Sequence, residues 1–237
     1  ISDIILLGTD RIHLFDTPLL MCRNQGLSME QRAAKRVLDI IVSGLGIIVS
    51  SPIMLIIAIA VKAYDGGPVF YLQDRLTYQG KEFRIRKFRS MCVDSEKNGA
   101  RLASKHDSRI TPVGHVLRNL HLDELPQLFN VFMGDMSLVG PRPERDVIMQ
   151  EYEQEIPEFH YRLKVKAGLT GYAQVYGKYN TTPYDKLKLD LFYIENYSFL
   201  LDIKLLFMTV KIFFQKEVSE GVDDNQKNAL KDSEDKK

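Results

Sequence analysis

The sequence predicts an α+β fold in which a long apolar helix with a break in its middle precedes a compact domain of short helices and a small sheet. The first observation is a nearly uninterrupted apolar stretch, Val37–Val61, with a proline inside it. The second is a pair of segments, Val69–Leu72 and Glu82–Phe88, whose composition is typical of strands. The third is a series of segments with helical spacing of apolar residues further along the chain. A chain of 237 residues suits one such domain with appendages.

Residues 1–31 are expected to be a linker or the remnant of an upstream region. The chain begins without methionine, and Ile4–Gly8 has the composition of a strand with nothing before it. A mixed apolar and polar run, Leu14–Met21, follows. We therefore expect the chain to be cut from a larger protein.

The apolar stretch Val37–Val61 has the length of a membrane helix. A straight helix of this length rises roughly 37 Å, more than the ~30 Å hydrocarbon core of a bilayer. Pro52 removes a backbone hydrogen bond and clashes with the preceding turn, so we expect a sharp bend there. The two arms are then about 22 Å and 14 Å long, each too short to cross alone. The hydroxyls of Ser50 and Ser51 can satisfy carbonyls that the bend frees.

Basic residues flank the apolar stretch on both sides. Because basic residues favour the cytoplasmic side and neither flank is clearly poorer in them, the charges fit a helix that enters and leaves by one face. Three interpretations stay open from the residues alone: a re-entrant hairpin, a kinked spanning helix and a buried helix of a soluble core. Gly44 and Gly46 allow close packing in each of them. The flanking residues are Arg32, Lys35 and Arg36 before the stretch, and Lys62, Arg75 and Lys81 after it.

The expected strand Glu82–Phe88 is unusually basic. Under strand alternation Arg84 and Arg86 lie on one face, whereas Lys87 and Arg89 share the other. One interpretation is a solvated edge strand whose charges prevent aggregation. The other is a surface that faces phosphates or lipid headgroups.

Two adjacent acids, Asp123 and Glu124, precede a short amphipathic segment. Pro126 fits only within the first turn of a helix, and Gly134 is its expected stop. Asp123 would then lie at or near the N-cap, where free N–H groups and the positive end of the helix dipole favour an anion. The pair is either a cap with a first-turn acid, or a divalent-metal site in which one carboxylate can attack phosphorus.

A proline-flanked arginine follows this segment. Pro141 and Pro143 restrict the backbone on both sides of Arg142, so its guanidinium has little backbone freedom. A rigid arginine suits bidentate recognition of phosphate or carboxylate, and the alternative is a turn with an exposed arginine.

Helices are expected at His115–Asn119, Val147–Phe159, Pro183–Tyr197 and Ser198–Phe214, a glycine-spaced loop and strand at Val165–Gly177, and a disordered tail at 215–237.

Composition narrows the class of protein. The formal net charge is +1, so no global field attracts nucleic acid. Cys22 and Cys92 form no CxxC pattern, which indicates a reducing compartment. The glycine-spaced loop has neither the Walker A nor the Rossmann spacing.

Six short motifs, in this order, resemble the bacterial sugar transferase family, the monotopic polyprenyl-phosphate phosphoglycosyl transferases. The resemblance runs from about Arg32 to Phe214, and residues 1–31 look like the end of the extension that longer members carry. The family often has a small hydroxyl residue where His121 stands, which leaves the role of His121 open. The motifs are Lys35-Arg36-x-x-Asp39, Ser51-Pro52, Gly67-Pro68-Val69-Phe70, Lys87-Phe88-Arg89-Ser90-Met91, Leu122-Asp123-Glu124-Leu125-Pro126-Gln127 and Gly140-Pro141-Arg142-Pro143-Glu144.

The resemblance implies a Mg²⁺-dependent enzyme of the bacterial inner (cytoplasmic) membrane. Residues 32–64 would form a membrane-inserted re-entrant hairpin, and residues 65–214 a catalytic domain on the cytoplasmic face. The enzyme would transfer a sugar-1-phosphate from a UDP-sugar to undecaprenyl phosphate, release UMP and start the assembly of O-antigen, capsule or exopolysaccharide. Membrane lipid is a further partner, nucleic acid is not, and a homodimer stays open. No motif encodes the sugar or the polymer.

The resemblance also implies roles for single residues. Asp123 would attack the β-phosphorus and carry the phosphosugar, and Glu124 would hold Mg²⁺ with help from Asp123. Three groups of residues complete the expected site: Arg118, Arg142 and Arg145 for donor phosphates; Lys87 and Arg89 for phosphate or for holding the site together; and Lys35, Arg36, Ser51 and Pro52 at the membrane, the first two near the lipid phosphate.

Three other classes are weighed against this one. A polytopic phosphoglycosyl transferase needs many spanning helices, and the sequence has one long apolar run. A CDP-alcohol phosphotransferase needs spaced aspartates around Asp-Gly and Ala-Arg, which the sequence lacks. A non-enzymatic, membrane-anchored adaptor would bind anionic lipid through the basic strand. It predicts no UMP release and indifference to chelators.

Overall fold

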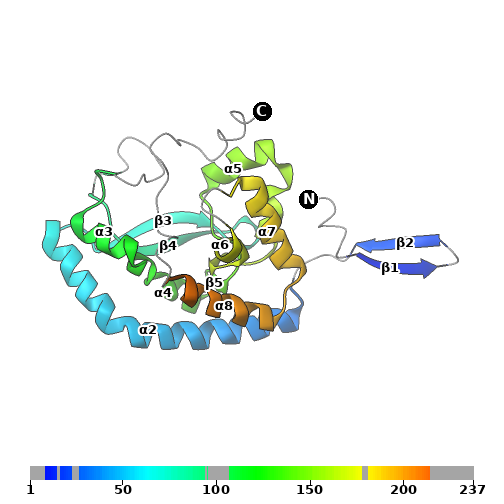
Figure 1. The fold of residues 1–237 in the computed structure, drawn as a ribbon, viewed down its shortest axis with the longest axis horizontal. Coiled ribbons are helices and arrows are strands. Elements are labelled where there is room, and N and C mark those ends of the chain that lie inside the picture. The colour runs from blue at the N-terminus through cyan, green and yellow to red at the C-terminus, as the bar shows by residue number, and fades with distance from the viewer. Residues whose placement is uncertain are drawn as a thin grey trace.

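The computed structural model describes residues 9–14, 17–22, 27–93, 95, 107–177 and 181–213, which combine helices with two-stranded sheets (Figure 1). The mixed α and β content that the sequence predicts is confirmed. The expected strand Ile4–Gly8 and the tail 215–237 lie outside the described residues. Sequence reasoning missed the antiparallel hairpin of β1 (Thr9–Leu14) and β2 (Thr17–Cys22).

The apolar stretch belongs to α2 (Met29–Asp65), one helix of 37 residues that curves along an edge of the domain (Figure 1). A capping box between Ser28 and Gln31 begins it, and Gly66, in the left-handed conformation at φ 69°, ends it. The helix continues through Pro52, so the expected break in the helix is wrong. The expected bend is present, because α2 changes direction near its middle (Figure 1). The hydroxyl of Ser51 donates to the carbonyl of Ile48 at 2.8 Å. That carbonyl is the one that loses its N–H donor at Pro52.

The two predicted strands are confirmed, and they form a hairpin. Strand β3 (Phe70–Leu76) pairs antiparallel with β4 (Glu82–Phe88), and the short helix η1 (Tyr78–Gly80) joins them. Strand β6 (Gly168–Thr170) lies within the predicted loop and strand Val165–Gly177. Its parallel partner β5 (Ser137–Val139) was not predicted. A Cβ on Gly168 would lie 2.1 Å from the backbone nitrogen of Gly140, so only glycine allows this approach.

Short helices surround these strands. The predicted helices after residue 110 are confirmed, with boundaries shifted by a few residues. Helix α3 lies toward the second half of α2, whereas α4 packs against its first half and middle, where Arg36, Gly44 and Gly46 lie. Helices α5, α7 and α8 lie toward the first half of α2 (Figure 1). The elements are α3 (Pro112–Asn119), η2 (Leu122–Glu124), α4 (Gln127–Met133), α5 (Asp146–Glu155), η3 (Pro157–Lys164), α6 (Tyr172–Tyr176), α7 (Pro183–Glu195) and α8 (Phe199–Phe213).

Two hydrophobic clusters hold the molecule together. The larger one joins the strands to α5, η3, α7 and α8, and includes Phe159, Leu187 and Leu205, each 0% exposed. The smaller one packs Ile57 and Val61 of α2 against Phe88. The second half of α2 is therefore attached to the domain by apolar contacts.

Polar contacts attach the first half of α2. The ammonium of Lys35 lies 2.6 Å from the carboxylate of Asp202 in α8. The carboxylate of Asp39 accepts a hydrogen bond from the backbone N–H of Leu138 at 2.9 Å and another from the hydroxyl of Ser137 at 3.0 Å. Arg36 donates to the last carbonyls of α4. The first motif of the family resemblance thus docks the helix onto the domain.

This docking changes the interpretation of Lys35. We expected its ammonium at the level of lipid headgroups, but the residue is 5% exposed. Its nitrogen bonds Asp202 and the hydroxyl of Tyr193, at 3.1 Å from the latter. An opposite charge inside the protein therefore binds this ammonium in place of a lipid phosphate, and the level of Lys35 relative to the headgroups stays a prediction.

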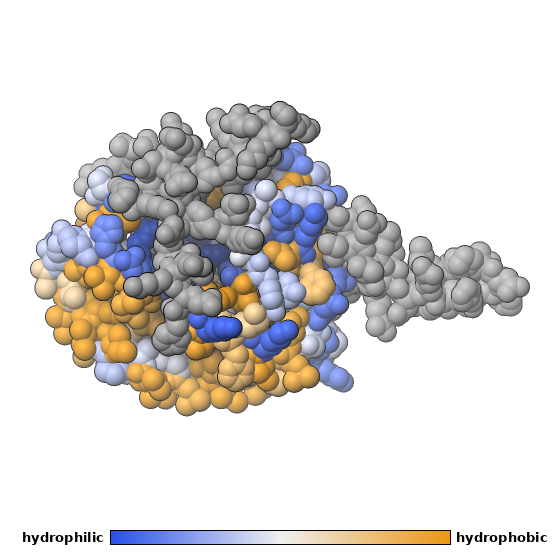
Figure 2. All heavy atoms as spheres, in the orientation of Figure 1, coloured by the Kyte–Doolittle hydropathy of each residue, from blue (hydrophilic) through white to orange (hydrophobic). Residues whose placement is uncertain are grey.

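The outer face of α2 is apolar and exposed (Figure 2). Among the described residues, α2 is the one helix long and apolar enough to cross a membrane. Gly44 and Gly46 lie on its inner side, where Leu128 and Phe132 of α4 approach them. The exposed side chains on α2 include Val37, Ile41, Leu45, Ile48, Val49, Leu55, Ile56 and Ile59, and Leu200 and Phe207 continue this surface type on α8.

Candidate active site

A tight turn places the two acids between α3 and α4. His121 adopts a left-handed conformation at φ 52°, which histidine tolerates better than most residues. The chain then forms η2, which carries Asp123 and Glu124. Helix α4 starts only at Gln127, with Pro126 as its N-cap. Asp123 was expected at or near the N-cap of this helix; it is not the cap itself but lies three residues before it, in η2. The predicted stop at Gly134 is confirmed.

Glu124 is held by two cations from distant parts of the chain. The ammonium of Lys87, in β4, lies 2.6 Å from its Oε1. The guanidinium of Arg142, in the loop after β5, lies 2.7 Å from the same oxygen. Burial raises the pKa of Glu124, but the charges of Arg142 and Lys87 outweigh it and hold this pKa well below its usual value. Glu124 is therefore ionised at neutral pH.

Asp123 differs from its neighbour in its partners. Within the described part of the chain, its carboxylate makes neither a hydrogen bond nor an ion pair. Burial raises its pKa, the charge of Lys87 opposes this, and the charge of Glu124 adds to it. Asp123 is thus a partly buried carboxylate whose oxygens are available to a ligand.

Besides Lys87 and Arg142, one further expected basic residue lies near the acids, and two others have their described contacts elsewhere. Arg118, in α3, is close enough for its charge to lower the pKa of Asp123. Arg145 begins α5, and its charge acts on Arg75. Arg89 forms an ion pair with Asp65 at the end of α2. Arg89 therefore holds the end of α2 to the domain.

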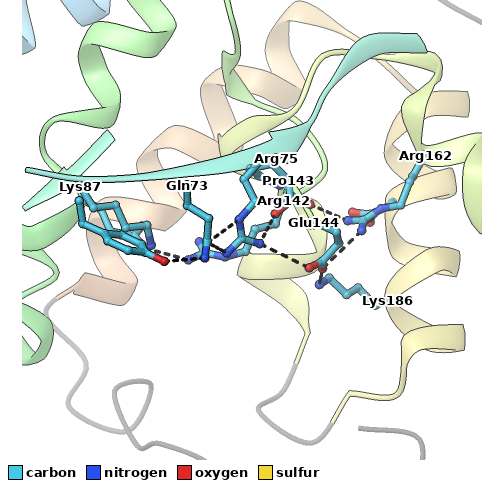
Figure 3. A network of polar contacts seen from close by, with 11 residues as sticks. Gln73, Arg75, Lys87, Arg142, Pro143, Glu144, Arg162 and Lys186 are labelled. Atoms are coloured by element: carbon cyan, nitrogen blue, oxygen red, sulfur yellow. Dashed lines mark hydrogen bonds and ion pairs between the residues drawn. The ribbon is translucent and has the colours of Figure 1, made fainter. Parts of the chain in front are cut away.

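A network of charged residues behind Arg142 was missed by sequence reasoning (Figure 3). Glu144 accepts contacts from Arg162 at 3.4 Å, from Arg75 at 3.8 Å and from Lys186. Burial raises the pKa of Glu144, but Lys186, Arg162 and Arg75 lower it to about 2. Glu144 directly follows the proline-flanked arginine, so its position was a usable signal, whereas the cations from β3, η3 and α7 are far apart in sequence.

The acidic pair has the donor atoms that a magnesium ion would need if a substrate supplied further ligands. Among the described residues, no group of three or more histidine, cysteine, aspartate or glutamate side chains could hold a metal. Mg²⁺ is commonly bound by one or two carboxylates together with water and substrate phosphates. Asp123 and Glu124 supply such a donor set, and the basic residues around them suit the phosphates.

Comparison with known proteins identifies the family. A sequence profile described as bacterial sugar transferase matches residues 30–216. The chain belongs to the bacterial sugar transferase family. Members of this family that resemble it include the UDP-N-acetylgalactosamine-undecaprenyl-phosphate N-acetylgalactosaminephosphotransferase of Aeromonas hydrophila, which is 44% identical over 180 residues, 75% of this chain and 43% of the relative.

Two further relatives carry other sugars in their names. The UDP-glucose:undecaprenyl-phosphate glucose-1-phosphate transferase of Klebsiella pneumoniae is 43% identical over 208 residues, 86% of this chain and 43% of the relative. The undecaprenyl-phosphate galactose phosphotransferase of Salmonella typhimurium is 37% identical over 230 residues, 90% of this chain and 47% of the relative. The chain spans less than half the length of each of these relatives.

Proposed function

We propose that this member of the family transfers a sugar-1-phosphate from a UDP-sugar to undecaprenyl phosphate. The names of the relatives support the class of both substrates. They name three different sugars, so overall similarity does not select one of them. The reaction would release UMP and leave the sugar on a lipid diphosphate, the first membrane-bound product in the assembly of a surface polysaccharide.

The observation that carries the proposal is that, in the part of the chain that the structure describes, one of two adjacent carboxylates is bound by cations and the other is not. Glu124 is bound by Lys87 and Arg142, whereas the oxygens of Asp123 have no such partner among the described residues. A nucleophile needs an uncommitted lone pair, and a phosphate site needs cations close to it. Asp123 meets the first requirement, and Lys87, Arg142 and Arg118 meet the second.

The reaction follows in two displacements. A carboxylate oxygen of Asp123 attacks the β-phosphorus of the UDP-sugar, and the bond from that phosphorus to UMP breaks, so the phosphosugar is bound to Asp123 and UMP leaves. A phosphate oxygen of undecaprenyl phosphate then attacks the same phosphorus and frees Asp123. Two steps allow one site to serve a soluble donor and a lipid acceptor in turn.

The basic residues offset the repulsion between a carboxylate nucleophile and its anionic substrates. Lys87 and Arg142 keep Glu124 ionised. The side chain of Arg142 is 42% exposed, so its guanidinium can also bind a phosphate. A Mg²⁺ ion bound by Glu124, with Asp123 beside it, would neutralise phosphate charge and orient the donor. Arg118, whose charge lowers the pKa of Asp123, is the second candidate to bind the donor phosphates.

The arrangement of α2 supports a re-entrant helix in the cytoplasmic membrane. Its start is tied to the domain by Lys35 and Asp202, and its end by Asp65 and Arg89. A spanning helix would separate its two ends by the full bilayer, about 30 Å of hydrocarbon. Both ends of α2 are bound to one domain, and the apolar side chains between them point away from it. The domain would then lie on the cytoplasmic face, where nucleotide sugars are available.

Release of UMP is the measurement that tests the function. The protein in nanodiscs is given undecaprenyl phosphate and, in turn, UDP-N-acetylgalactosamine, UDP-glucose and UDP-galactose. We expect UMP release with one of them, and its loss when EDTA removes Mg²⁺. If UMP is released at the same rate in the presence of EDTA, the proposed magnesium site is contradicted. If no UMP is released with any of the donors, a non-enzymatic adaptor that binds anionic lipid through β4 is favoured.

Asp123→Asn tests the nucleophile. The variant should release no UMP and should trap no radiolabelled sugar phosphate on the protein, because the amide oxygen is a poor nucleophile. Asp74→Asn is the matched control, since Asp74 is a surface carboxylate on β3 whose side chain is 70% exposed. Turnover by Asp123→Asn near the rate of the wild type would show that the nucleophile is another group.

Cysteine labelling tests the topology. Single cysteines at Met29 and Tyr64, which are 85% and 51% exposed, mark the two ends of α2 in a protein whose Cys22 and Cys92 are replaced by serine. A re-entrant helix predicts that an impermeant reagent labels both positions from the cytoplasmic side only. Labelling of the two positions from opposite sides would establish a spanning helix.

A further inference from the structure

The loop that carries Arg142 is held at every carbonyl between residues 141 and 144. The carbonyl of Pro141 accepts from the backbone N–H of Gly168 at 2.9 Å. The carbonyl of Glu144 accepts from the N–H of Leu76 at 3.0 Å. The two carbonyls between them are bound by arginine side chains and not by backbone groups, which makes the loop dependent on those arginines.

Arg162 is the donor to Arg142 itself. Its Nη2 donates to the backbone carbonyl of Arg142 at 2.9 Å, and the neighbouring Arg75 donates to the carbonyl of Pro143 at 3.0 Å. Arg162 is 2% exposed, so its guanidinium is out of reach of a substrate. Its effect on the site passes through the backbone of Arg142.

Asp190 determines where the guanidinium of Arg162 lies. Its carboxylate oxygen Oδ2 accepts from Nη2 of Arg162 at 2.7 Å and from Nε at 3.1 Å. The carboxylate is 2% exposed, and a buried ion pair of this kind is strongly dependent on both partners. Burial raises the pKa of Asp190, and the charge of Arg162 opposes this shift.

The contacts form one continuous path from α7 to the acidic pair. Asp190 orients Arg162, Arg162 binds the carbonyl of Arg142, and the guanidinium of Arg142 contacts Glu124 at 2.7 Å. Figure 3 shows Arg162 and Glu144 on one side of Arg142 and Lys87 on the other. Glu144 balances the charges of Arg75, Arg162 and Lys186, so the cations can lie close together.

We propose that Arg162 and Asp190 are positioning residues, which set the orientation of Arg142 at Glu124 without touching a substrate. This inference rests on the proposed function, because its main readout is turnover. A small displacement of a group that orients the reacting atoms costs on the order of 100-fold in rate. Loss of the Asp190 carboxylate should have an effect of this size on kcat/KM.

A double-mutant cycle separates positioning from general damage. The rates of UMP release are compared for the wild type, Asp190→Asn, Arg142→Ala and the double variant. If Asp190 acts through Arg142, Asp190→Asn has no more than about a threefold effect once Arg142 is absent. If the two effects multiply, Asp190 supports the fold alone and the proposal is overturned.

Asp202→Asn is the matched control for this cycle. Asp202 is likewise a buried aspartate on a C-terminal helix, and it pairs with Lys35 at 2.6 Å. Its partners are Lys35 and Tyr193, on α2 and α7. The reductions in the rate of UMP release caused by Asp202→Asn and by Arg142→Ala should therefore multiply in the double variant. An equally strong non-additivity for Asp202 would overturn the specific path through Arg162.

Arg162→Lys covers the case in which Asp190→Asn does not fold. Lysine keeps a positive charge beside Asp190 but cannot reproduce the paired contacts of a guanidinium. The same non-additivity with Arg142→Ala is expected, and independent effects would overturn the proposal.

Hydrogen exchange gives a readout that does not require turnover. In Asp190→Asn, amides in residues 138–146 should exchange faster, while those of α2 should not change. If the wild type releases no UMP with any donor, the proposed function fails, yet faster exchange confined to 138–146 still supports the positioning role. Unchanged exchange in this segment would overturn it.

Discussion

Helices α2 and α7 differ in where their apolar side chains lie: α7 buries most of its leucines against the domain, whereas α2 exposes most of its leucines, isoleucines and valines. Helix α7 buries Leu187, Leu191 and Ile194. The first half of α2 buries Lys35, Asp39 and Ser43, and α2 exposes isoleucine, leucine and valine along its outer face. A helix in water follows the first pattern, because apolar area removed from water stabilises the fold. The inversion in the first half of α2 is what the proposed membrane insertion requires, with polar contacts toward the domain and apolar side chains on the outer face.

The largest expected effect is a difference in membrane insertion between lysine substitutions at two almost equally exposed valines. Val49 on α2 is 75% exposed, and Val147 on α5 is 74% exposed. Val49→Lys should cost about 3 kcal/mol of membrane insertion, because a charge at the centre of the bilayer is expensive. Val147→Lys should cost nothing measurable. Flotation of the two variants with liposomes measures the difference.

If the two variants float equally well with liposomes, the exposed apolar face of α2 does not insert into lipid. The outer face of α2 would then be a surface that another protein covers, and the same lysine at Leu200 of α8, which is 76% exposed, would also be tolerated.

The charged interior of the domain should respond to acid. The pKa of Glu144 is lowered to about 2 from its usual 4.5, so its ionised form stabilises the folded state. This contribution is fully present above pH 4.5 and is lost as the pH falls toward 2. Hydrogen bonds to a charged group are worth about 1.5–3 kcal/mol each, which sets the scale of the loss.

Glu144→Gln should remove this part of the acid dependence. Unfolding of wild type and variant is followed by circular dichroism between pH 6 and pH 2, and the stability of the variant should change less across this interval. Equal slopes would show that Glu144 is not the titrating group. The outer face of α2 is uncharged and should not contribute to the change of stability with pH.

The smallest expected effect concerns the proline within α2. Ser51→Ala removes the hydrogen bond to the carbonyl of Ile48 and should cost about 1 kcal/mol. In a Pro52→Ala background the restored N–H can bind that carbonyl, so Ser51→Ala should then cost much less. Thermal melts followed by circular dichroism measure this, since the chain has no tryptophan for fluorescence.

Ser50→Ala is the control for this pair. The hydroxyl of Ser50 donates to the carbonyl of Gly46 at 2.6 Å, and this carbonyl keeps its own N–H donor in the helix. The cost of Ser50→Ala should therefore be the same with and without Pro52. If Ser51→Ala is also indifferent to Pro52, its hydroxyl does not compensate for the proline.

Much of the fold could be predicted because its signals are local. The long apolar stretch, the strands β3 and β4 and the helices after residue 110 each follow from periodicity within one segment. Strand β5 and its parallel pairing with β6 were missed, because three-residue strands have no readable period. The site was only partly predicted: Asp123, Glu124 and Arg142 belong to short motifs, whereas Arg162 and Asp190 carry no local pattern.

The sequence by itself determined the family, the apolar helix and the acids and arginine of the site, since each depends on neighbouring residues. Only the tertiary structure decided that Lys35 binds Asp202 instead of lipid, and that Arg162 and Asp190 support Arg142. The physical reason is that a buried charge needs an opposite charge, and the residue that supplies it is selected by packing between elements far apart in the chain.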